Sequence, residues 1–266
     1  EYTRLFLGNP QQVSTKTALS EEQAQAFKEA ADPGIDVLVS IVTLRYSRLL
    51  EPGAPPAEER LETIRLLAGM GFHVTLFLRP IIPGVTDKEY KEIIERAYRA
   101  GARSLVPGSL RVTARIRMRL AASRLVDPRE LDRRLTRRPR GPRDQVPITT
   151  ADIKQAVINY ARKLGMSVHP SSCSSNIASH GLSCAACRLG PCGDPSSLPV
   201  VDEDAIHAIA EKAGARLAWA RVRGPVVEYS LVQGGRRERD IIDSWIASLA
   251  KRTPVHVKHG RSPRLR

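Results

Sequence analysis

Short apolar runs alternate with longer segments of helical periodicity up to about residue 170. The runs have the length and composition of strands and cover residues 13–16, 37–44, 73–78, 104–107 and 167–169. Between them, apolar positions recur every three or four residues in segments 21–31, 57–69, 87–100 and 151–164. Ser20 and Thr150 stand at the N-cap positions of the first and last of these helices. Buried strands that alternate with helices predict βα units around a parallel sheet.

The pattern changes after a linker rich in Gly, Pro and Ser at residues 190–199. From residue 200 it predicts a helix, two strands joined by a turn at Gly224-Pro225, a second helix and a last strand. These elements cover residues 202–213, 216–223, 226–232, 236–249 and 255–258. The apolar faces of the two helices are sufficient to cover one side of a small sheet. We therefore expect a small α+β domain that carries no catalytic constellation.

Composition excludes several protein classes. Hydrophobic residues make up 42% of the 266 residues and charged residues 26%, and no apolar run approaches the roughly 20 residues that cross a bilayer. Fibrous, disordered and membrane-spanning proteins are therefore not expected. The opening residues EYTRLFLGNP lack both the basic and the apolar region of a secretory signal. We expect a soluble cytoplasmic protein, and the absence of an initial Met favours a chain cut from a longer one.

The net charge of +14 is concentrated in one segment. Residues 111–143 hold twelve arginines against Asp127, Glu130 and Asp132, a net charge of +9 in 33 residues. The stretch from Arg133 to Pro142 is too polar and too rich in proline for a core, so it predicts an exposed arm or loop. Such a segment favours binding to a polyanion, although a solubilising surface is an equal alternative. The nucleic-acid contacts would come from Arg133, Arg134, Arg137, Arg138, Arg140 and Arg143.

All four cysteines fall within 20 residues, with the spacing C-x10-C-x2-C-x4-C. Soft ligands gathered on loops of a chain without an export signal suit a metal, either Zn or an iron–sulfur cluster. Two disulfides or scattered core cysteines are the alternatives. His169 and His180 could each replace a ligand, but could equally be loop histidines. The predicted ligands are Cys173, Cys184, Cys187 and Cys192.

The middle of the chain resembles the radical S-adenosylmethionine (SAM) superfamily, in particular the branch of spore photoproduct lyase and the DNA-repair-photolyase-like proteins. The matching text runs in order from VSTK (13–16) through VSIVTL (39–44) and LEPGAPP (50–56) to LRPIIPGV (78–85). The resemblance covers about residues 13–112 and is weaker up to about 170. It implies a partial (βα)6 barrel that holds a [4Fe-4S] cluster and SAM. Reductive cleavage of this SAM gives a 5′-deoxyadenosyl radical.

One departure from the family pattern is decisive. The family holds its cluster with a C-x3-C-x2-C loop after the first strand, and this sequence contains no such spacing. Only about four strands can be counted in residues 13–112, where the resemblance is strongest, whereas the barrel has six. We therefore expect a barrel that is incomplete at its N-terminus, because the chain is truncated, belongs to a split gene or is a remnant. By itself it should not cleave SAM, and a second chain could supply the missing half.

The resemblance also carries four cofactor-binding residues. Lys16 would neutralise the SAM carboxylate, and Ser40 and Thr43 would point hydroxyls into the barrel. Arg79 would bind SAM or an anionic substrate at the end of a strand, where barrel sites are built. A surface lysine and satisfied core hydroxyls are the alternative roles. The four cysteines lie too late in the chain for the radical-SAM loop, so a metal there would be an auxiliary cluster or structural Zn.

These observations define four regions and three functions. The regions are a partial radical SAM barrel at 1–112, an arginine-rich arm at 113–150, a last barrel helix with the four-cysteine segment at 151–195, and the α+β domain at 200–266. The leading function is a fragment or subunit of a radical SAM lyase that acts on nucleic acid, in the manner of DNA repair. The rivals are a non-catalytic, metal-stapled module that binds nucleic acid, and a radical SAM enzyme with a protein or small-molecule substrate.

Overall fold

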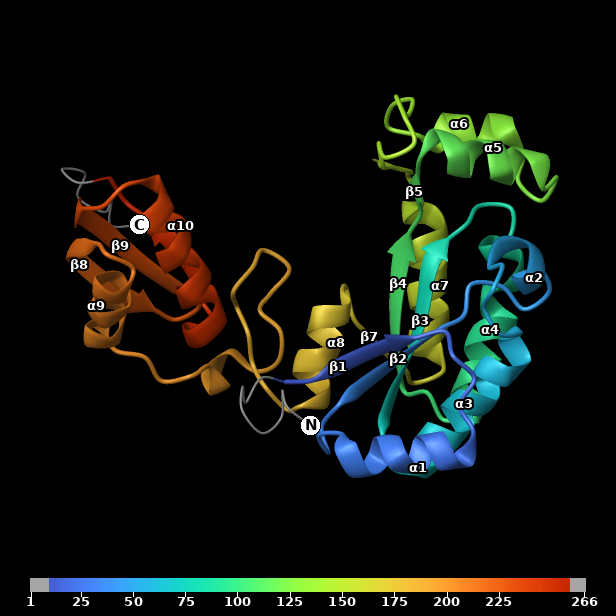
Figure 1. Cartoon of the computed structure of the whole chain (residues 1–266), viewed down its shortest axis with the longest axis horizontal. Coiled ribbons are helices and arrows are strands. Elements are labelled where there is room, and N and C mark those ends of the chain that lie inside the picture. Colours follow the sequence, from blue (N-terminus) through green and yellow to red (C-terminus); the bar gives the residue numbers. More distant parts are fainter. Residues whose placement is uncertain (1–9, 259–266) are drawn as a thin grey trace. The chain divides into compact units, whose positions relative to one another are not determined.

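The computed structural model describes residues 10–258 and divides the chain into two compact units, Glu1–Ser179 and His180–Arg266 (Figure 1). The first unit contains a sheet of five parallel strands in the order β1-β2-β3-β4-β7. The strands are β1 Gln12–Thr15, β2 Asp36–Ser40, β3 His73–Ile81, β4 Ser104–Ser109 and β7 Ser167–Val168. The expected α/β class with a parallel sheet is confirmed.

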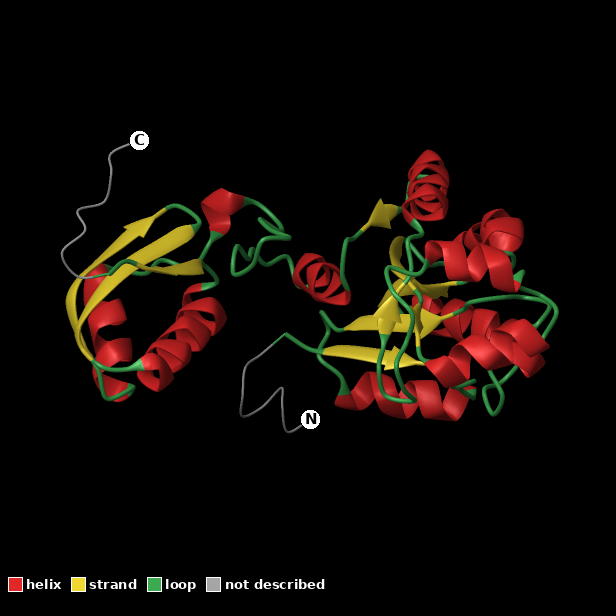
Figure 2. Ribbon diagram, turned by 90° about the horizontal axis from the view of Figure 1, so that it is seen from above, coloured by secondary structure: helices red, strands yellow, loops and turns green. Residues whose placement is uncertain are grey.

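Four helices bury one face of this sheet. They are α1 Glu21–Ala30, α3 Ala57–Gly69, α4 Thr86–Ala100 and α7 Ala151–Lys163, and in Figure 2 they line one side of the strands. Every second strand residue, such as Val37, Leu76 and Leu105, packs into their common core. Ser20 caps α1 in a capping box, as predicted. Thr150 precedes α7 but does not cap it, because its hydroxyl donates to Ser109 at 2.6 Å.

The segment expected to be an arm is folded. It contains β5 Arg111–Val112, α5 Ala114–Ala122, α6 Pro128–Arg134 and β6 Val146–Pro147, with β5 and β6 paired antiparallel. Leu120, Val126, Leu131 and Ile148 belong to a separate apolar core. These few apolar residues alternate with the arginines along the sequence, and their side chains all face this core. We call residues 111–148 the arginine-rich subdomain.

Two further short helices belong to the first unit, α2 Ser47–Leu50 and α8 Ser172–Ser179. Helix α8 packs on β2 and β4. Because the other four helices cover the opposite face of the sheet, α8 lies on the face that they leave open.

The second unit agrees closely with its predicted elements. Helix α9 Glu203–Lys212, the hairpin β8 Arg216–Arg223 and β9 Val226–Gln233, helix α10 Arg236–Trp245 and strand β10 Thr253–His256 follow one another. A 3-10 turn, Pro195–Ser197, precedes them, and one π turn, Ile246–Ala250, continues α10. The sheet order is β10-β9-β8, and both helices share one core with it. Among residues 10–258, no helix is both long enough and apolar enough to span a membrane.

Candidate functional site

The arginine-rich subdomain is seated on the carboxyl ends of three strands. Its apolar core includes Val42, which follows β2, Ile82 and Val85, which follow β3, and Leu110, which follows β4. Figure 1 shows α5 and α6 beyond the ends of β3 and β4. Ligands of α/β folds bind outside the carboxyl ends of parallel strands. The subdomain therefore lies beside the edge of the sheet where such a site would form.

Three acidic residues of the subdomain are each bound by an arginine side chain. Arg117 binds Asp132, Arg133 binds Glu130, and Arg137 binds Asp144 at 2.6 Å. The bonds from Arg137 and from the backbone of Arg140 hold the pKa of the Asp144 carboxyl far below its ordinary value.

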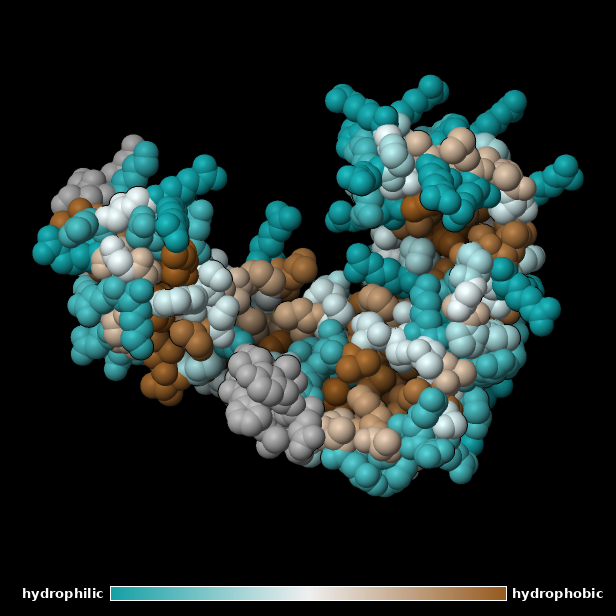
Figure 3. Space-filling model, viewed as in Figure 1, coloured by the Kyte–Doolittle hydropathy of each residue, from teal (hydrophilic) through white to brown (hydrophobic). Residues whose placement is uncertain are grey.

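Other arginines of the subdomain have no acidic side chain at ion-pair distance within the described residues. They are Arg111, Arg115, Arg119, Arg124, Arg129, Arg138, Arg140 and Arg143, and all of them are exposed. Figure 3 shows hydrophilic side chains projecting from this part of the molecule. Five of the six arginines expected to face solvent do so, since Arg133 and Arg137 are also exposed. Their binding of nucleic acid stays a prediction.

Arg134 is the exception and corrects the expectation. Its side chain is only 19% exposed and bridges Glu130, the carbonyl of Thr149 and, through two nitrogens at 2.7 and 2.8 Å, Asp152. This pairing lowers the pKa of Asp152 to about 2. Arg134 therefore fastens α6 to the first turn of α7 and does not point to a ligand.

Three charged side chains form a continuous row across the carboxyl ends of β1 and β2. The ammonium of Lys16 lies 2.8 Å from Glu51, and the other oxygen of Glu51 lies 2.7 Å from Arg60. The side chain of Arg60 is fully buried and donates to the carbonyl of Ser40 at 2.7 Å. Lys16, Thr17 and Glu51 line a pocket of about 330 Å³ with the loop at 52–55. The sequence singled out Lys16 and Ser40 as candidate site residues, but not Glu51 and Arg60. The feature that could have indicated this pair is the opposite charge of the two residues on either side of the PGAPP turn.

Arg79 lies on the same open face of the sheet. Its neighbour Phe77 pairs with Ser40 in register, and the Arg79 guanidinium lies 6.0 Å from the centre of the Phe77 ring. The Arg79 side chain crosses Gly108, where a Cβ atom would come within 2.5 Å of it. Arg79 is exposed, and no carboxylate within the described residues pairs with it. Glycine at position 108 thus leaves room for the arginine beside a carboxyl end.

Thr43 has a different environment. It is buried, and its hydroxyl donates to Glu89 of α4 at 2.7 Å, the same oxygen that accepts the backbone N–H of Leu44. Glu89 was not singled out from the sequence. It fastens the loop that follows β2 to α4. The assignment of Lys16, Ser40, Thr43 and Arg79 to SAM remains a prediction.

The cysteines fall on both sides of the division between the units. Cys173 lies on α8 in the first unit, and the other three lie in the second. Cys184 and Cys192 pair through two backbone hydrogen bonds of 2.9 and 2.7 Å, and all four residues are thiols. Throughout the described ranges, no three His, Cys, Asp or Glu side chains are arranged to hold a metal. The residues present therefore do not fit the radical-SAM cluster, and the four-cysteine site stays a prediction.

A second polar cluster lies at the amino ends of the strands, on the same open face. Nδ1 of His73 is 3.0 Å from Asp36, and its Nε2 is 3.0 Å from the hydroxyl of Ser104. Nε2 of His169 lies 3.3 Å from the same hydroxyl. Burial alone raises the pKa of Asp36, but its hydrogen-bond donors, His73 first among them, lower it overall. Sequence analysis missed this cluster, although Asp36, His73 and Ser104 each begin a predicted or observed strand.

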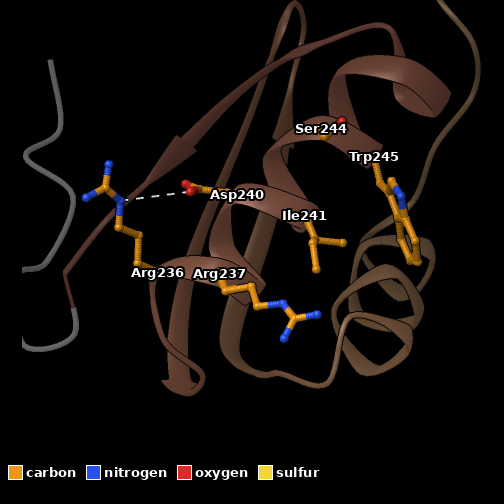
Figure 4. A pocket seen from close by; sticks show the side chains of 6 residues that line it. All are labelled: Arg236, Arg237, Asp240, Ile241, Ser244 and Trp245. Carbon is orange, nitrogen blue, oxygen red and sulfur yellow. Dashed lines mark ion pairs between the residues drawn. The ribbon is translucent and has the colours of Figure 1, made fainter.

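The second unit has its own pocket along α10. It has a volume of about 580 Å³ and is lined by Arg236, Arg237, Asp240, Ile241, Ser244 and Trp245 (Figure 4). Arg236 lies 3.9 Å from Asp240, one helical turn away. The pocket has no pair of groups suited to acid–base or nucleophilic chemistry. The first unit therefore carries the candidate site.

Of three comparisons with known proteins, only the comparison with solved structures found matches. No protein-family model matches the chain, and no curated protein does. A spore photoproduct lyase variant with bound AdoMet and dinucleoside spore photoproduct aligns at 18% identity and a TM-score of 0.44, covering 59% of this chain and 49% of that one. Spore photoproduct lyase complexed with dinucleoside spore photoproduct aligns at 17% identity and a TM-score of 0.42. The chain thus spans about half the length of these proteins, and a likeness this distant assigns no function.

Proposed function

We propose that this chain is part of a radical SAM enzyme of the photolyase-like branch and that it acts on nucleic acid. The ordered sequence motifs support the superfamily, and they surround the carboxyl ends of a parallel sheet. Lys16, Ser40 and Arg79 lie at that edge and would contact SAM or substrate. The cluster ligands would come from another part of the protein or a second chain. When bound, the cluster and SAM would supply the radical.

The arginine-rich subdomain carries the proposal. Its unpaired, exposed arginines stand beside the carboxyl ends of β2, β3 and β4, because its core is built on the residues that follow these strands. A guanidinium without a carboxylate partner is available to a phosphate, and binding releases counterions from the nucleic acid. Phosphate contacts position a substrate without reading its sequence. The subdomain would therefore hold the backbone of a nucleic acid beside the site.

The salt dependence of DNA binding tests this role. Arg138, Arg140 and Arg143 lie in one exposed loop, and their guanidinium groups form no ion pair with an acidic side chain within the described residues. If each neutralises one phosphate, replacing all three by Ser should flatten the slope of log K against log salt by about 2.7 for duplex DNA. Fluorescence anisotropy with a labelled duplex from about 50 to 200 mM salt measures this slope.

A matched control removes the same charge elsewhere. Lys28 on α1 and Arg162 and Lys163 on α7 are three exposed cations on helices that cover the opposite face of the sheet. The K28S/R162S/K163S variant should keep the wild-type slope. Equal flattening by both variants would indicate only the net charge of the chain, and an unchanged slope in the loop variant would overturn the role of the subdomain.

SAM binding separates this function from its rivals. Equilibrium dialysis with labelled SAM should show binding that Arg79→Ser weakens, if Arg79 contacts cofactor or substrate as proposed. DNA binding without SAM binding would favour the non-catalytic, metal-stapled module. SAM binding without DNA binding would favour a protein or small-molecule substrate.

A further inference from the structure

One continuous chain of hydrogen bonds joins four side chains at the amino ends of the strands. It runs from Asp36 through His73 and Ser104 to His169, with separations of 3.0, 3.0 and 3.3 Å. Parallel register brings them together, because Asp36 pairs with His73 and residues two apart on a strand share a face. Asp36 is completely buried, whereas the side chain of His73 is 29% exposed. Protons can therefore reach this network from solvent.

The donors and acceptors of these four side chains limit how many protons the hydrogen-bond network can hold. Asp36 accepts bonds from Gln12 and Thr75 at 2.7 Å each, and an ionised carboxylate can only accept, so Nδ1 of His73 carries a proton. When both histidines are neutral, Ser104 donates to His73 and accepts from His169. A proton added to His73 reverses these bonds, and Ser104 then donates to His169. A second proton makes both imidazoles donors, and the Ser104 hydroxyl hydrogen then has no acceptor among the four side chains of the network.

The same network holds helix α8 on the sheet. Gln12, which donates to Asp36, also donates to the carbonyl of Ser172 at 2.6 Å. Thr75, the other donor to Asp36, lies 2.9 Å from the hydroxyl of Ser175. His169 stands three residues before the start of α8. Any movement that brings a charged His169 into water therefore pulls on the segment that leads into this helix.

We propose that Asp36, His73, Ser104 and His169 form a protonation switch that keeps α8 docked on the open face of the sheet when His169 is neutral and releases it when both histidines are charged. Release would uncover the amino-end half of this face. The switch does not depend on the proposed function, since it involves neither SAM nor nucleic acid.

The electrostatic environment sets the direction of the switch. Among the described residues, the charged and titratable groups that face one another here are Asp36, His73 and His169, and the one titratable side chain of α8 is the exposed thiol of Cys173. Burial, and then the charge of His73, lower the pKa of His169. The docked state therefore disfavours a proton that His169 takes up freely, near pH 6.5, once it is in water. Docking is complete above that pH and weakens as the pH falls below it.

Hydrogen exchange of α8, corrected for the intrinsic rate at each pH, tests the proposal. Because opening takes up one proton, protection of residues 172–179 should fall by up to about fivefold between pH 6.5 and 5.5. Protection of α7 should not change. His169→Gln keeps a polar group beside Ser104 but cannot take a charge, so this variant should lose the pH dependence.

A second measurement covers failure of the variant to fold. Imidazole NMR of the wild-type chain should place the pKa of His169 below that of an exposed histidine, and Ser104→Ala should move it whereas Ser104→Thr should not. Protection of α8 that is independent of pH in the wild type would overturn the proposal. The same loss of protection in His169→Gln as in the wild type would also overturn it, since the loss would then arise from other groups.

Discussion

The buried pair between Glu51 and Arg60 gives a quantitative test of the first unit. Arg60→Met removes the guanidinium but keeps an unbranched apolar side chain in place of the arginine stem. It leaves the Glu51 carboxylate, whose side chain is 4% exposed, with Lys16 as its remaining cation. It also removes the donor to the Ser40 carbonyl at the end of β2. Breaking one partner of a buried ion pair costs about 3–5 kcal/mol, because the other charge stays buried without compensation.

The positions of the two tryptophans provide an internal control. Trp219 and Trp245 are the only tryptophans of the chain, and both lie in the second unit, which has its own core. Their fluorescence therefore follows the unfolding of that unit, whereas far-UV circular dichroism reports both units. With a urea dependence of about 2 kcal/mol per molar, Arg60→Met should move the first unit's transition down by about 1.5–2.5 M. The fluorescence transition should stay in place.

A double variant checks the origin of the loss. Glu51→Gln removes the charge that Arg60→Met leaves behind, so the combined variant should be more stable than Arg60→Met alone. A circular dichroism midpoint that moves by less than about 0.5 M would refute the reasoning that this pair is buried and interdependent. An equal shift in the tryptophan signal would refute the independence of the two cores.

Three other changes have defined outcomes. Arg134→Ser should lower the stability of the first unit by about 1 kcal/mol without changing the salt slope of DNA binding. The stabilisation that Arg134 gains from the ionised Asp152 is fully present above the ordinary pKa of Asp, near 4, and is lost as the pH falls through about 2. Acid unfolding of the wild type and the variant would show this difference. Gly101→Ala should destabilise by about 1 kcal/mol or more in urea, because Gly101 has a φ of +114° and a Cβ there would lie 2.5 Å from that of Ala68, whereas Gly141→Ala meets nothing within 4 Å and should be neutral. If the four cysteines bind a cluster, anaerobically purified protein should be coloured and lose its visible absorbance when it is treated with a chelator and an oxidant. Colourless protein that releases Zn to a chelator would indicate the structural site, and protein with neither metal would contradict both.

Local patterns in the sequence were enough to locate most helices and strands. Helix α3 begins and ends at the predicted residues, 57 and 69, and β8 covers 216–223 as predicted, because apolar period and turn residues are properties of the segment itself. Helix α8 escaped prediction for the same reason. Its sequence SCSSNIAS has weak helix propensity, and contacts with Gln12 and Thr75 hold it in place. The helices of the arginine-rich subdomain were missed because charge obscured their few apolar positions.

The sequence by itself determined which residues could act: the cations at the ends of the predicted strands, the arginine-rich segment and the cysteine spacing. Only the tertiary structure decided which of them meet. Glu51 joins Lys16 to Arg60, Arg134 turns inward to Asp152, and Asp36 reaches His73 across 37 positions of the chain. Register between parallel strands and the burial of charge depend on contacts that are distant in sequence. No local period encodes such contacts, whereas the periods that build each strand and helix are complete within the segment.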